Sequence, residues 1–391
     1  MTVLYASDLP PRFSSVGWWR KVVLRWTGGI YKLIGLEMGI FLGLWYIGWA
    51  LASQGSFNTN HFDGYVASFR LYQGTVRTML GFMLVYYYQE IYSRARRIFF
   101  AIPFPDSTFL AINATIGQAD ERGRVLKQTI FRYILATSFL LYHATSKMMQ
   151  RKYREPWKTM VHLGLLTEEE VQRIRERVRD YPYPGEVSFV PLAWATLTIR
   201  QAFDDDQVVP KAKNNTYPFT VNTALKALQD YRSQCGSLLF EVYFPFPLLL
   251  SQLVTLVVYS YFLVSLVSQQ NLSSEQTFIF PVFTAMEFIV YMGALRVGQT
   301  FTQPLGEDDN SFEIVAFFTR GLRLAHLYGA YGSSKHDFLA NPLPVVDLGD
   351  IQDKITAKLP LYFYRSDVAR KPVDSCSQHV SKIDSLAIPL L

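Results

Sequence analysis

The amino-acid sequence predicts an all-α membrane protein, with four transmembrane helices that continue into a cytosolic helical bundle. The first reason is composition: of 391 residues, 50% are hydrophobic, 15% are aromatic and only 18% are charged, whereas an ordinary globular protein carries about 25% charged residues. The second is a set of four stretches that approach the roughly 20 mostly apolar residues of a membrane helix. The third is the arginine and lysine beside these stretches, which mark the cytosolic side of a membrane protein.

The first two stretches form a predicted transmembrane hairpin. The first covers about residues 31–52 and has no acidic or basic side chain after Glu37. The second covers about residues 78–93 and reads TMLGFMLVYYYQEIYS, which is polar and aromatic for a membrane helix. Because three arginines follow it closely, we expect the chain to return to the cytosol there.

The last two stretches form a second predicted hairpin. The third stretch lies within residues 242–274, a run of 33 residues without a charged side chain, and the fourth covers about residues 278–297 with one carboxylate, Glu287. A fifth apolar stretch, residues 130–149, contains two basic side chains and a histidine. We expect this fifth stretch to be a helix buried among protein, because ionisable groups are expensive in lipid.

Basic side chains before the first stretch predict a cytosolic N-terminus, and an even number of crossings returns the C-terminus to the cytosol. We expect the plasma membrane as the location. Thr167 and the three glutamates after it predict a capped helix start in the cytosolic region. The chain then divides into an N-terminal cytosolic segment (1–30), a first transmembrane hairpin (31–93), a cytosolic helical region (94–236), a second transmembrane hairpin (237–298), an acidic segment with a cytosolic helix (299–345) and a C-terminal tail (346–391).

Several classes of protein are disfavoured by what the sequence contains. The net charge of +6 is dispersed or flanks the apolar stretches, and no recognition module accompanies it, so we expect no nucleic-acid binding. Two cysteines, Cys235 and Cys376, are too few for a disulfide framework. They are also not arranged as zinc ligands. The sequence has no arrangement of nucleophile and base, no Walker loop and no zinc-protease helix, so we expect no enzyme.

An acidic cluster, Pro-Leu-Gly-Glu-Asp-Asp-Asn-Ser-Phe-Glu, occupies residues 304–313 after the fourth stretch. Hard oxygen ligands packed this densely suit calcium, which takes about six to eight oxygens, many of them backbone carbonyls. The glycine and the terminal glutamate of an EF-hand are missing at the required spacing. From the residues alone, a solvated acidic turn at the start of a helix remains an open alternative.

The cluster resembles the calcium-binding segment of the bestrophin family, Asn-Pro-Phe-Gly-Glu-Asp-Asp-Asp-Asp-Phe-Glu, which aligns without a gap on residues 303–313. Other blocks similar to that family occur in family order over residues 1 to about 325: Met-Thr-Val-x-Tyr at 1–5, Arg-Trp-x-Gly-x-Ile-Tyr-Lys at 25–32, Ile-Pro-x-Pro-Asp at 102–106, Asp-Glu-x-Gly-Arg at 120–124, Arg-Tyr at 132–133, Gln-Cys-Gly at 234–236 and Pro-Val-Phe-Thr at 281–284.

The resemblance implies a set of calcium ligands. In the family, the first and fourth aspartates of the run bind calcium through their side chains, and nearby backbone carbonyls complete the site. Asp308 keeps the first carboxylate, but Ser311 stands at the fourth position, so one charged ligand is missing. The resemblance implies that the backbone carbonyl oxygens of Thr300, Gln303 and Pro10 also bind the calcium ion. Fewer carboxylates predict weaker calcium binding.

The resemblance also implies that the second stretch lines a pore. The family's neck consists of three large apolar side chains spaced four residues apart, and the ungapped alignment places it at Thr78, Phe82 and Tyr86. Aligning the Gly81-Phe82 pair instead shifts it to Gly74, Thr78 and Phe82 and needs a four-residue insertion. Ordinary packing of an aromatic stripe is the alternative. A second, cytosolic aperture is implied at Phe219, which would otherwise be read as a core residue.

The function that the resemblance implies is a calcium-gated anion channel that conducts chloride and other monovalent anions through the centre of a homo-pentamer in the lipid bilayer. A non-conducting membrane scaffold that regulates other channels is the alternative. A secondary transporter is disfavoured, because no repeat of broken helices is visible. Among the ionisable groups at apparent membrane depth, we expect Glu37 to meet an arginine, and we expect His143 to be a satisfied buried histidine rather than a ligand.

Overall fold

The computed structural model describes residues 28–53, 59–116, 121–178, 184–205, 217–268, 281–308 and 311–331, together with Val22, Arg25 and Trp26. All of these residues belong to one compact unit of the chain. Within these ranges every regular element is a helix, as the sequence predicts.

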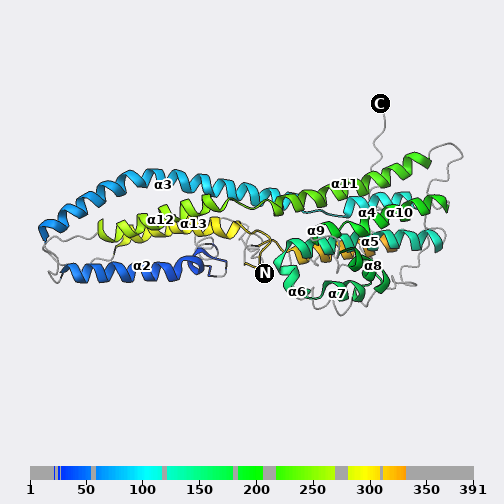
Figure 1. Ribbon diagram of the computed structural model, residues 1–391, viewed down its shortest axis with the longest axis horizontal. Coiled ribbons are helices and arrows are strands. Elements are labelled where there is room, and N and C mark those ends of the chain that lie inside the picture. Colours follow the sequence, from blue (N-terminus) through cyan, green and yellow to red (C-terminus); the bar gives the residue numbers. More distant parts are fainter. Residues whose placement is uncertain are drawn as a thin grey trace, which may run out of the picture. The chain divides into compact units, whose positions relative to one another are not determined.

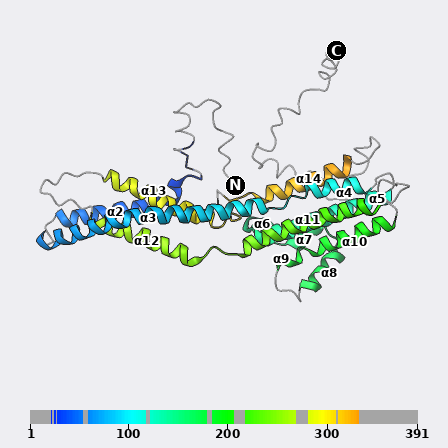
Figure 2. The same cartoon turned by 90° about the horizontal axis from the view of Figure 1, so that it is seen from above.

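Four helices form the first group: α2 (Ile30–Ser53), α3 (Thr59–Ala101), α12 (Leu248–Ser268) and α13 (Val282–Phe301). They lie side by side over the N-terminal half of α3 (Figures 1 and 2). Apolar side chains of all four helices form one core, in which the rings of Phe41 and Phe288 stack at 4.9 Å and those of Phe262 and Phe288 lie 4.8 Å apart. Gly298 lets α13 approach α3 closely, since a Cβ at this position would lie 2.7 Å from the ring of Tyr87.

Helix α3 is far longer than the predicted second stretch. It runs without a break for 43 residues, which is about 65 Å at 1.5 Å per residue, so it extends well beyond the roughly 30 Å of a bilayer's hydrocarbon core. No proline interrupts it, and Pro103 follows shortly after its last residue. A proline disfavours the helical conformation of the residue before it, which accounts for the end of α3 at this point.

The uncharged run at residues 242–274 is not a single helix. Its first residues complete α11 (Tyr217–Tyr243), and α12 begins only at Leu248. Pro245 and Pro247 lie between the two helices, and proline removes a helical hydrogen bond and clashes with the preceding turn. The long apolar run is therefore divided by its own prolines.

Two of the described helices, over Ile30–Leu51 and Leu248–Ser268, have the length and apolar composition to cross a membrane. Helices α3 and α13 are not apolar enough to meet the same criterion, because they carry charged side chains such as Arg77, Glu287 and Arg296 among their apolar residues. Helix α2 leaves a strongly apolar face uncovered, with Leu36 at 80% exposure. Exposed apolar surface of this kind is typical of helices that contact lipid or another subunit.

The second group surrounds α5 (Glu121–Thr145), which packs against α4 (Asp106–Thr115), α10 (Val190–Asp204), α11 and α14 (Ile314–Tyr331). Four further helices complete it: α6 (Lys147–Lys152), α7 (Pro156–His162), α8 (Glu168–Val178) and α9 (Pro184–Val187). Ile130, Ile134 and Phe139 of α5 are fully buried. This confirms that the fifth apolar stretch is a helix within protein, although the helix ends at Thr145 and a new one begins at Lys147.

The predicted start of α8 is also confirmed. The backbone N–H of Glu170 donates to Oγ1 of Thr167 at 3.3 Å, and the N–H of Thr167 donates to Oε2 of Glu170 at 2.8 Å. This reciprocal pair is a capping box, in which two otherwise unpaired backbone donors are satisfied. The same Glu170 carboxylate accepts from the Tyr133 hydroxyl at 2.7 Å, so the cap also attaches α8 to α5.

Lys127 of α5 is an uncommon feature of this helical group, because the side chain is fully buried. Its Nζ donates to Oδ1 of Asn113 on α4 at 2.7 Å. Burial lowers the pKa of Lys127 from its ordinary value of 10.5 to about 8. Below pH 8 the folded protein therefore holds a charged ammonium in an apolar site, which opposes folding.

We predict that Lys127→Met raises the free energy of unfolding at pH 7 by roughly 2 kcal/mol, because each unit of pKa displacement corresponds to about 1.4 kcal/mol and one hydrogen bond is lost. The gain over the unsubstituted protein should shrink as the pH rises from 8 to above 10.5, because lysine loses its charge first in the folded state and then in the unfolded state. Chemical unfolding in detergent at pH 7 and pH 10 measures this. Lys158→Met on the exposed surface is the control. A gain independent of pH would contradict the prediction.

Candidate functional site

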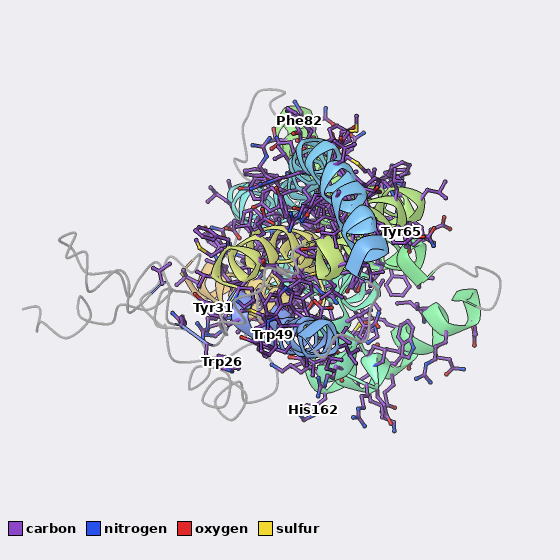
Figure 3. All side chains as sticks on the ribbon, turned by 90° about the vertical axis from the view of Figure 1, so that its left-hand side faces the viewer. Trp26, Tyr31, Trp49, Tyr65, Phe82 and His162 are labelled. Atoms are coloured by element: carbon purple, nitrogen blue, oxygen red, sulfur yellow. The ribbon has the colours of Figure 1, made fainter. Side chains whose placement is uncertain are left out.

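Thr78, Phe82 and Tyr86 lie on the side of α3 that faces away from the chain's own core. Phe82 is 75% exposed and Tyr86 is 60% exposed, and Figure 3 shows Phe82 on the outer side of the helix. The opposite side of α3 supplies Leu80, Leu84, Tyr87 and Ile91 to the core. Gly74 is exposed on the same side as Phe82, so both sequence alignments of the neck use one helix face.

Two polar contacts attach the N-terminal half of α3 to the end of α12. Nε of Arg70 donates to the backbone oxygen of Ser268 at 2.8 Å, and the hydroxyl of Ser268 donates to Oε1 of Gln73 at 2.6 Å. Ser268 and Gln73 are both buried. Buried polar groups of this kind stabilise the structure only where they are hydrogen-bonded, so these contacts fix how α3 lies along α12.

An ion pair joins α3 to α13 beside the predicted neck. Nη2 of Arg77 lies 2.8 Å from Oε1 of Glu287, whose side chain is only 18% exposed. The hydroxyl of Tyr261 on α12 donates to the other carboxylate oxygen at 3.2 Å. Arg77 directly precedes Thr78 in sequence. The pair therefore limits rotation of α3 at the point where the neck residues begin.

A second ion pair links α2, α12 and α13. The guanidinium of Arg296 binds the carboxylate of Glu37, with Nε at 3.1 Å from Oε2 and Nη2 in contact with Oε1. The hydroxyl of Tyr259 donates to Glu37 Oε1 at 2.9 Å, and Nη1 of Arg296 donates to Gln299 at 2.6 Å. The expectation that Glu37 meets an arginine is confirmed.

The acidic segment after α13 folds into a closed loop. The N–H of Gly306 donates to the Gln303 oxygen at 3.0 Å, the N–H of Ser311 donates to the Asp308 oxygen at 3.0 Å, and the N–H of Phe312 donates to the Pro304 oxygen at 2.8 Å. Thr300 lies in the last turn of α13, Asp308 is exposed and Ser311 is buried. Four of the five predicted calcium ligands are thus brought into one helix end and the loop that follows it.

The loop is suited to an oxygen-ligated cation in two respects. A Cβ at Gly306 would lie 3.0 Å from the Gln303 oxygen and 3.4 Å from the Ser311 hydroxyl oxygen, so glycine lets these two oxygens lie close to the backbone here. The oxygen atoms that could bind a cation here belong to carbonyls, a hydroxyl and one carboxylate, which are the hard ligands that calcium takes. Within the described ranges no group of three or more histidine, cysteine or acidic residues could hold a metal ion, so any such site depends on carbonyl oxygens.

Neighbouring helices hold the loop in place. Oγ of Ser146 donates to the Leu305 oxygen at 3.3 Å, Nζ of Lys147 donates to Oε1 of Gln303 at 3.0 Å, and Nη1 of Arg151 donates to Oε2 of Glu307 at 2.9 Å. These three side chains come from α6 and the residue before it. The loop is therefore attached to the α5–α6 corner of the second helical group.

Arg94 connects the loop to the predicted pore helix. Its Nη1 donates to the Thr302 oxygen at 2.9 Å, and its Nη2 donates to the oxygens of Phe244 at 3.1 Å and Glu241 at 3.3 Å. One side chain of α3 thereby binds the end of α13 and the proline-containing turn between α11 and α12. The sequence does not distinguish Arg94 from Arg96, because its acceptors are backbone carbonyls, which no side-chain pattern reveals.

Some predicted positions lie outside what the structure describes. Pro10 is outside the described residues, as are Asp309 and Asn310. Phe219 lies in the first turn of α11, but its side chain is outside the described part of the chain. His143, expected to be a partnered histidine, is half-buried with Nε2 at 3.0 Å from the Tyr153 oxygen. Burial lowers the pKa of His143, in agreement with a neutral, structural side chain.

Comparison with known proteins identifies the family. The sequence profile described as "Bestrophin, RFP-TM, chloride channel" matches residues 1–328 of this chain. The chain belongs to the bestrophin family. This bestrophin is 27% identical to mouse Bestrophin-2 over 340 residues, which cover 84% of the chain and 63% of the relative. It is 25% identical to Bestrophin homolog 14 of Caenorhabditis elegans, over 88% of the chain and 80% of the relative.

Solved structures support the fold of this bestrophin. A crystal structure of a bacterial bestrophin homolog from Klebsiella pneumoniae superposes with a TM-score of 0.55 at 16% identity and covers 75% of this chain and 99% of the bacterial one. The chain spans under two thirds of the length of the mouse relative. At this level of identity the likeness shows a common fold, and the roles of individual residues in this bestrophin rest on its own geometry.

We predict that Glu37 and Arg296 are strongly coupled in stability. Glu37→Ala leaves a partly buried guanidinium without its carboxylate, and Arg296→Ala leaves the carboxylate without its cation. The double variant should therefore lose less free energy of unfolding than the sum of the losses in the two single variants. The double-mutant cycle should give a coupling of about 1–3 kcal/mol. Thermal unfolding in detergent measures it, with the exposed pair Glu155 and Lys158 as the control cycle. Additive effects at the two positions would show that the pair contributes nothing.

Proposed function

We propose that this chain is the subunit of a calcium-gated chloride channel and that five copies surround a central pore lined by the exposed face of α3. The observation that carries the proposal is the exposed stripe of Thr78, Phe82 and Tyr86 on a helix whose opposite side forms the core. Within the described residues the predicted neck positions lie on α3 alone, and one helix cannot enclose a pore. Identical subunits that contact one another head to tail enclose one when the ring closes.

The same proposal assigns α2, α3, α12 and α13 as four membrane-crossing helices with both termini in the cytosol, at the plasma membrane. Helices α3 and α13 carry charges that lipid would disfavour, but Arg77 is paired with Glu287 and Glu37 with Arg296. Ionisable residues within membrane helices characteristically face other helices and pair with one another. Pairing therefore removes the main objection to crossing by these two helices.

The neck of such a pore would close through its apolar side chains and would favour anions over cations through weak dipoles. A ring of Phe82 side chains forms a narrow apolar constriction that closes when water leaves it. Thr78 and Tyr86 add hydroxyl groups on either side, so this neck should hydrate more easily than a fully apolar one. Anions can be favoured without a fixed cation at the neck, through helix N-termini and the positive edges of aromatic rings.

For gating, we assign Asp308 and Ser311, with the carbonyls of Thr300, Gln303 and Pro10, as the residues that hold calcium. A bound calcium ion supplies two positive charges that several oxygens can share. The chain's own contribution is the connection from this loop to the pore helix. Arg94 binds the Thr302 oxygen beside the loop and belongs to the same helix as Phe82. A movement of the loop on calcium binding would therefore also move α3, which carries the neck residues.

The purified protein in a planar bilayer should conduct chloride with calcium and be closed without it. Phe82→Ala should then give several-fold more current in the absence of calcium, because a wider neck has a lower dewetting barrier. Phe283→Ala, which removes an 85% exposed phenylalanine of α13, is the matched control. A variant at Phe82 that gates normally would mean that the constriction lies elsewhere. No current from any form, with intact oligomers, would favour a non-conducting scaffold.

The calcium site gives a second prediction. Ser311→Asp should tighten calcium binding by an order of magnitude or so, because affinity at oxygen-ligand sites follows the number of charged ligands. Asp308→Ala should abolish it. Since Ser311 is buried, the added carboxylate should also lower the melting temperature in a chelator and restore it in calcium, as expected for a ligand that binds only the folded state.

Titration of calcium against current and against melting temperature measures both effects. Asp205→Ala is the matched control, because it removes a carboxylate that is paired with Arg122 and lies outside the acidic loop. Unchanged titrations in the two loop variants would show that this loop does not bind calcium and that the channel opens by another means.

A further inference from the structure

The exposed stripe of α3 does not end at the neck. Eighteen residues separate Phe82 from Phe100, which is about five turns at 3.6 residues per turn, so the two rings lie on one line along the helix. Phe100 is 76% exposed. Ile91 and Ile98 occupy the opposite, buried side. The face that carries the neck residues therefore continues to the C-terminal end of α3.

Arg96 and Arg97 lie on either side of this line. They border a hollow of about 560 Å³ between α3 and α11, which is lined by Arg96, Arg97, Phe100, Ala101, Ser237, Phe240 and Glu241. Two exposed phenylalanines, Phe100 and Phe240, form its apolar walls.

The charges in the hollow do not cancel. Nε of Arg97 lies 3.3 Å from Oε1 of Glu241, and its Nη1 donates to Oγ of Ser93 at 3.2 Å. Arg96 is exposed, and the described ranges contain no carboxylate paired with it. Two guanidinium groups and one carboxylate leave one positive charge, and arginine keeps its charge at every physiological pH.

We propose that Arg96, with the Arg97–Glu241 pair beside it, forms a binding site for a small inorganic anion, namely the permeant chloride, on the cytosolic side of the neck. This proposal rests on the proposed function, because the channel assignment is what puts the stripe of α3 on the pore. Arg96 follows Phe82 by 14 residues, about 21 Å along the helix. The site therefore concentrates anions below the constriction, in addition to the dipoles at the neck.

A cysteine probe tests the site without requiring conduction. Ser237→Cys is placed in a Cys376→Ser background, where the remaining Cys235 is buried. The rates of modification by a negatively charged and by a positively charged methanethiosulfonate reagent are then compared. Arg96 should favour the anionic reagent, so Arg96→Gln should lower the ratio of the two rates several-fold at about 10 mM salt. At 1 M salt the rate ratios of the unsubstituted protein and of Arg96→Gln should become equal. The screening length is about 30 Å at 10 mM salt and about 3 Å at 1 M.

Two variants control for changes other than charge. Arg96→Lys keeps the charge and should keep the ratio. Arg173→Gln removes an exposed arginine on α8 and should leave the ratio unchanged. An unchanged ratio in Arg96→Gln would overturn the proposal, whether or not the protein conducts.

Current recordings complete the test. Chloride current carried from the cytosolic side should fall several-fold in Arg96→Gln at low salt and be nearly normal at 1 M salt. If the probe ratio changes but the current does not, the hollow binds anions off the conduction path and the assignment to the pore is wrong. If the unsubstituted protein carries no current while the probe ratio still changes, the anion site stands and the proposed channel function fails.

Discussion

Helices that pack within a membrane gain little from burying apolar surface, since lipid is as apolar as a leucine side chain, and their arrangement depends on polar contacts and close approach. Two ion pairs supply such contacts among α2, α3, α12 and α13, the four helices proposed to cross the membrane. Glu37 and Arg296 join α2 to α13, and Arg77 and Glu287 join α3 to α13. Tyr259 and Tyr261 of α12 bind the two carboxylates. Helix α13 is thus the element to which the other three are attached, and the orientation of α3 follows from it.

Once α3 is fixed, its sequence determines which face is free. Leucines and a tyrosine at helical spacing fill the core, and the opposite face carries Phe82, Tyr86 and, further along, Arg96. The absence of a proline makes this one rigid element, which joins the membrane-type helices to the second helical group. Arg94 then ties the same helix to carbonyls at the ends of two others. The continuous helix and this one side chain together connect the acidic loop to the proposed neck.

Much of this could be predicted from local sequence. Hydrophobicity and length locate α2 and α12, the Thr167 cap locates α8, and the four-residue spacing of Thr78, Phe82 and Tyr86 predicts their shared face. The length of α3 was underestimated because hydropathy reports where a helix is apolar and not where it ends. The prolines at 245 and 247 could have divided the third stretch, since proline interrupts helices irrespective of polarity. Partners such as Arg77 and Glu287 are 210 residues apart, and no local pattern connects them.

The shape of the acidic loop depends on contacts that need no carboxylate at residue 311. Backbone hydrogen bonds join its described residues, Gly306 approaches the Gln303 oxygen closely, and Ser146, Lys147 and Arg151 contact the loop from outside. The hydroxyl of Ser311 is buried, at the position where the family resemblance implies a carboxylate. A buried carboxylate three residues from the exposed carboxylate of Asp308 would be disfavoured by burial and by like charge, whereas a hydroxyl is not. The affinity of an oxygen-ligand site depends on both ligand charge and rigidity. For the proposed calcium site, a serine at residue 311 removes one ligand charge, while the side-chain contacts from Ser146, Lys147 and Arg151 that hold the loop do not involve residue 311.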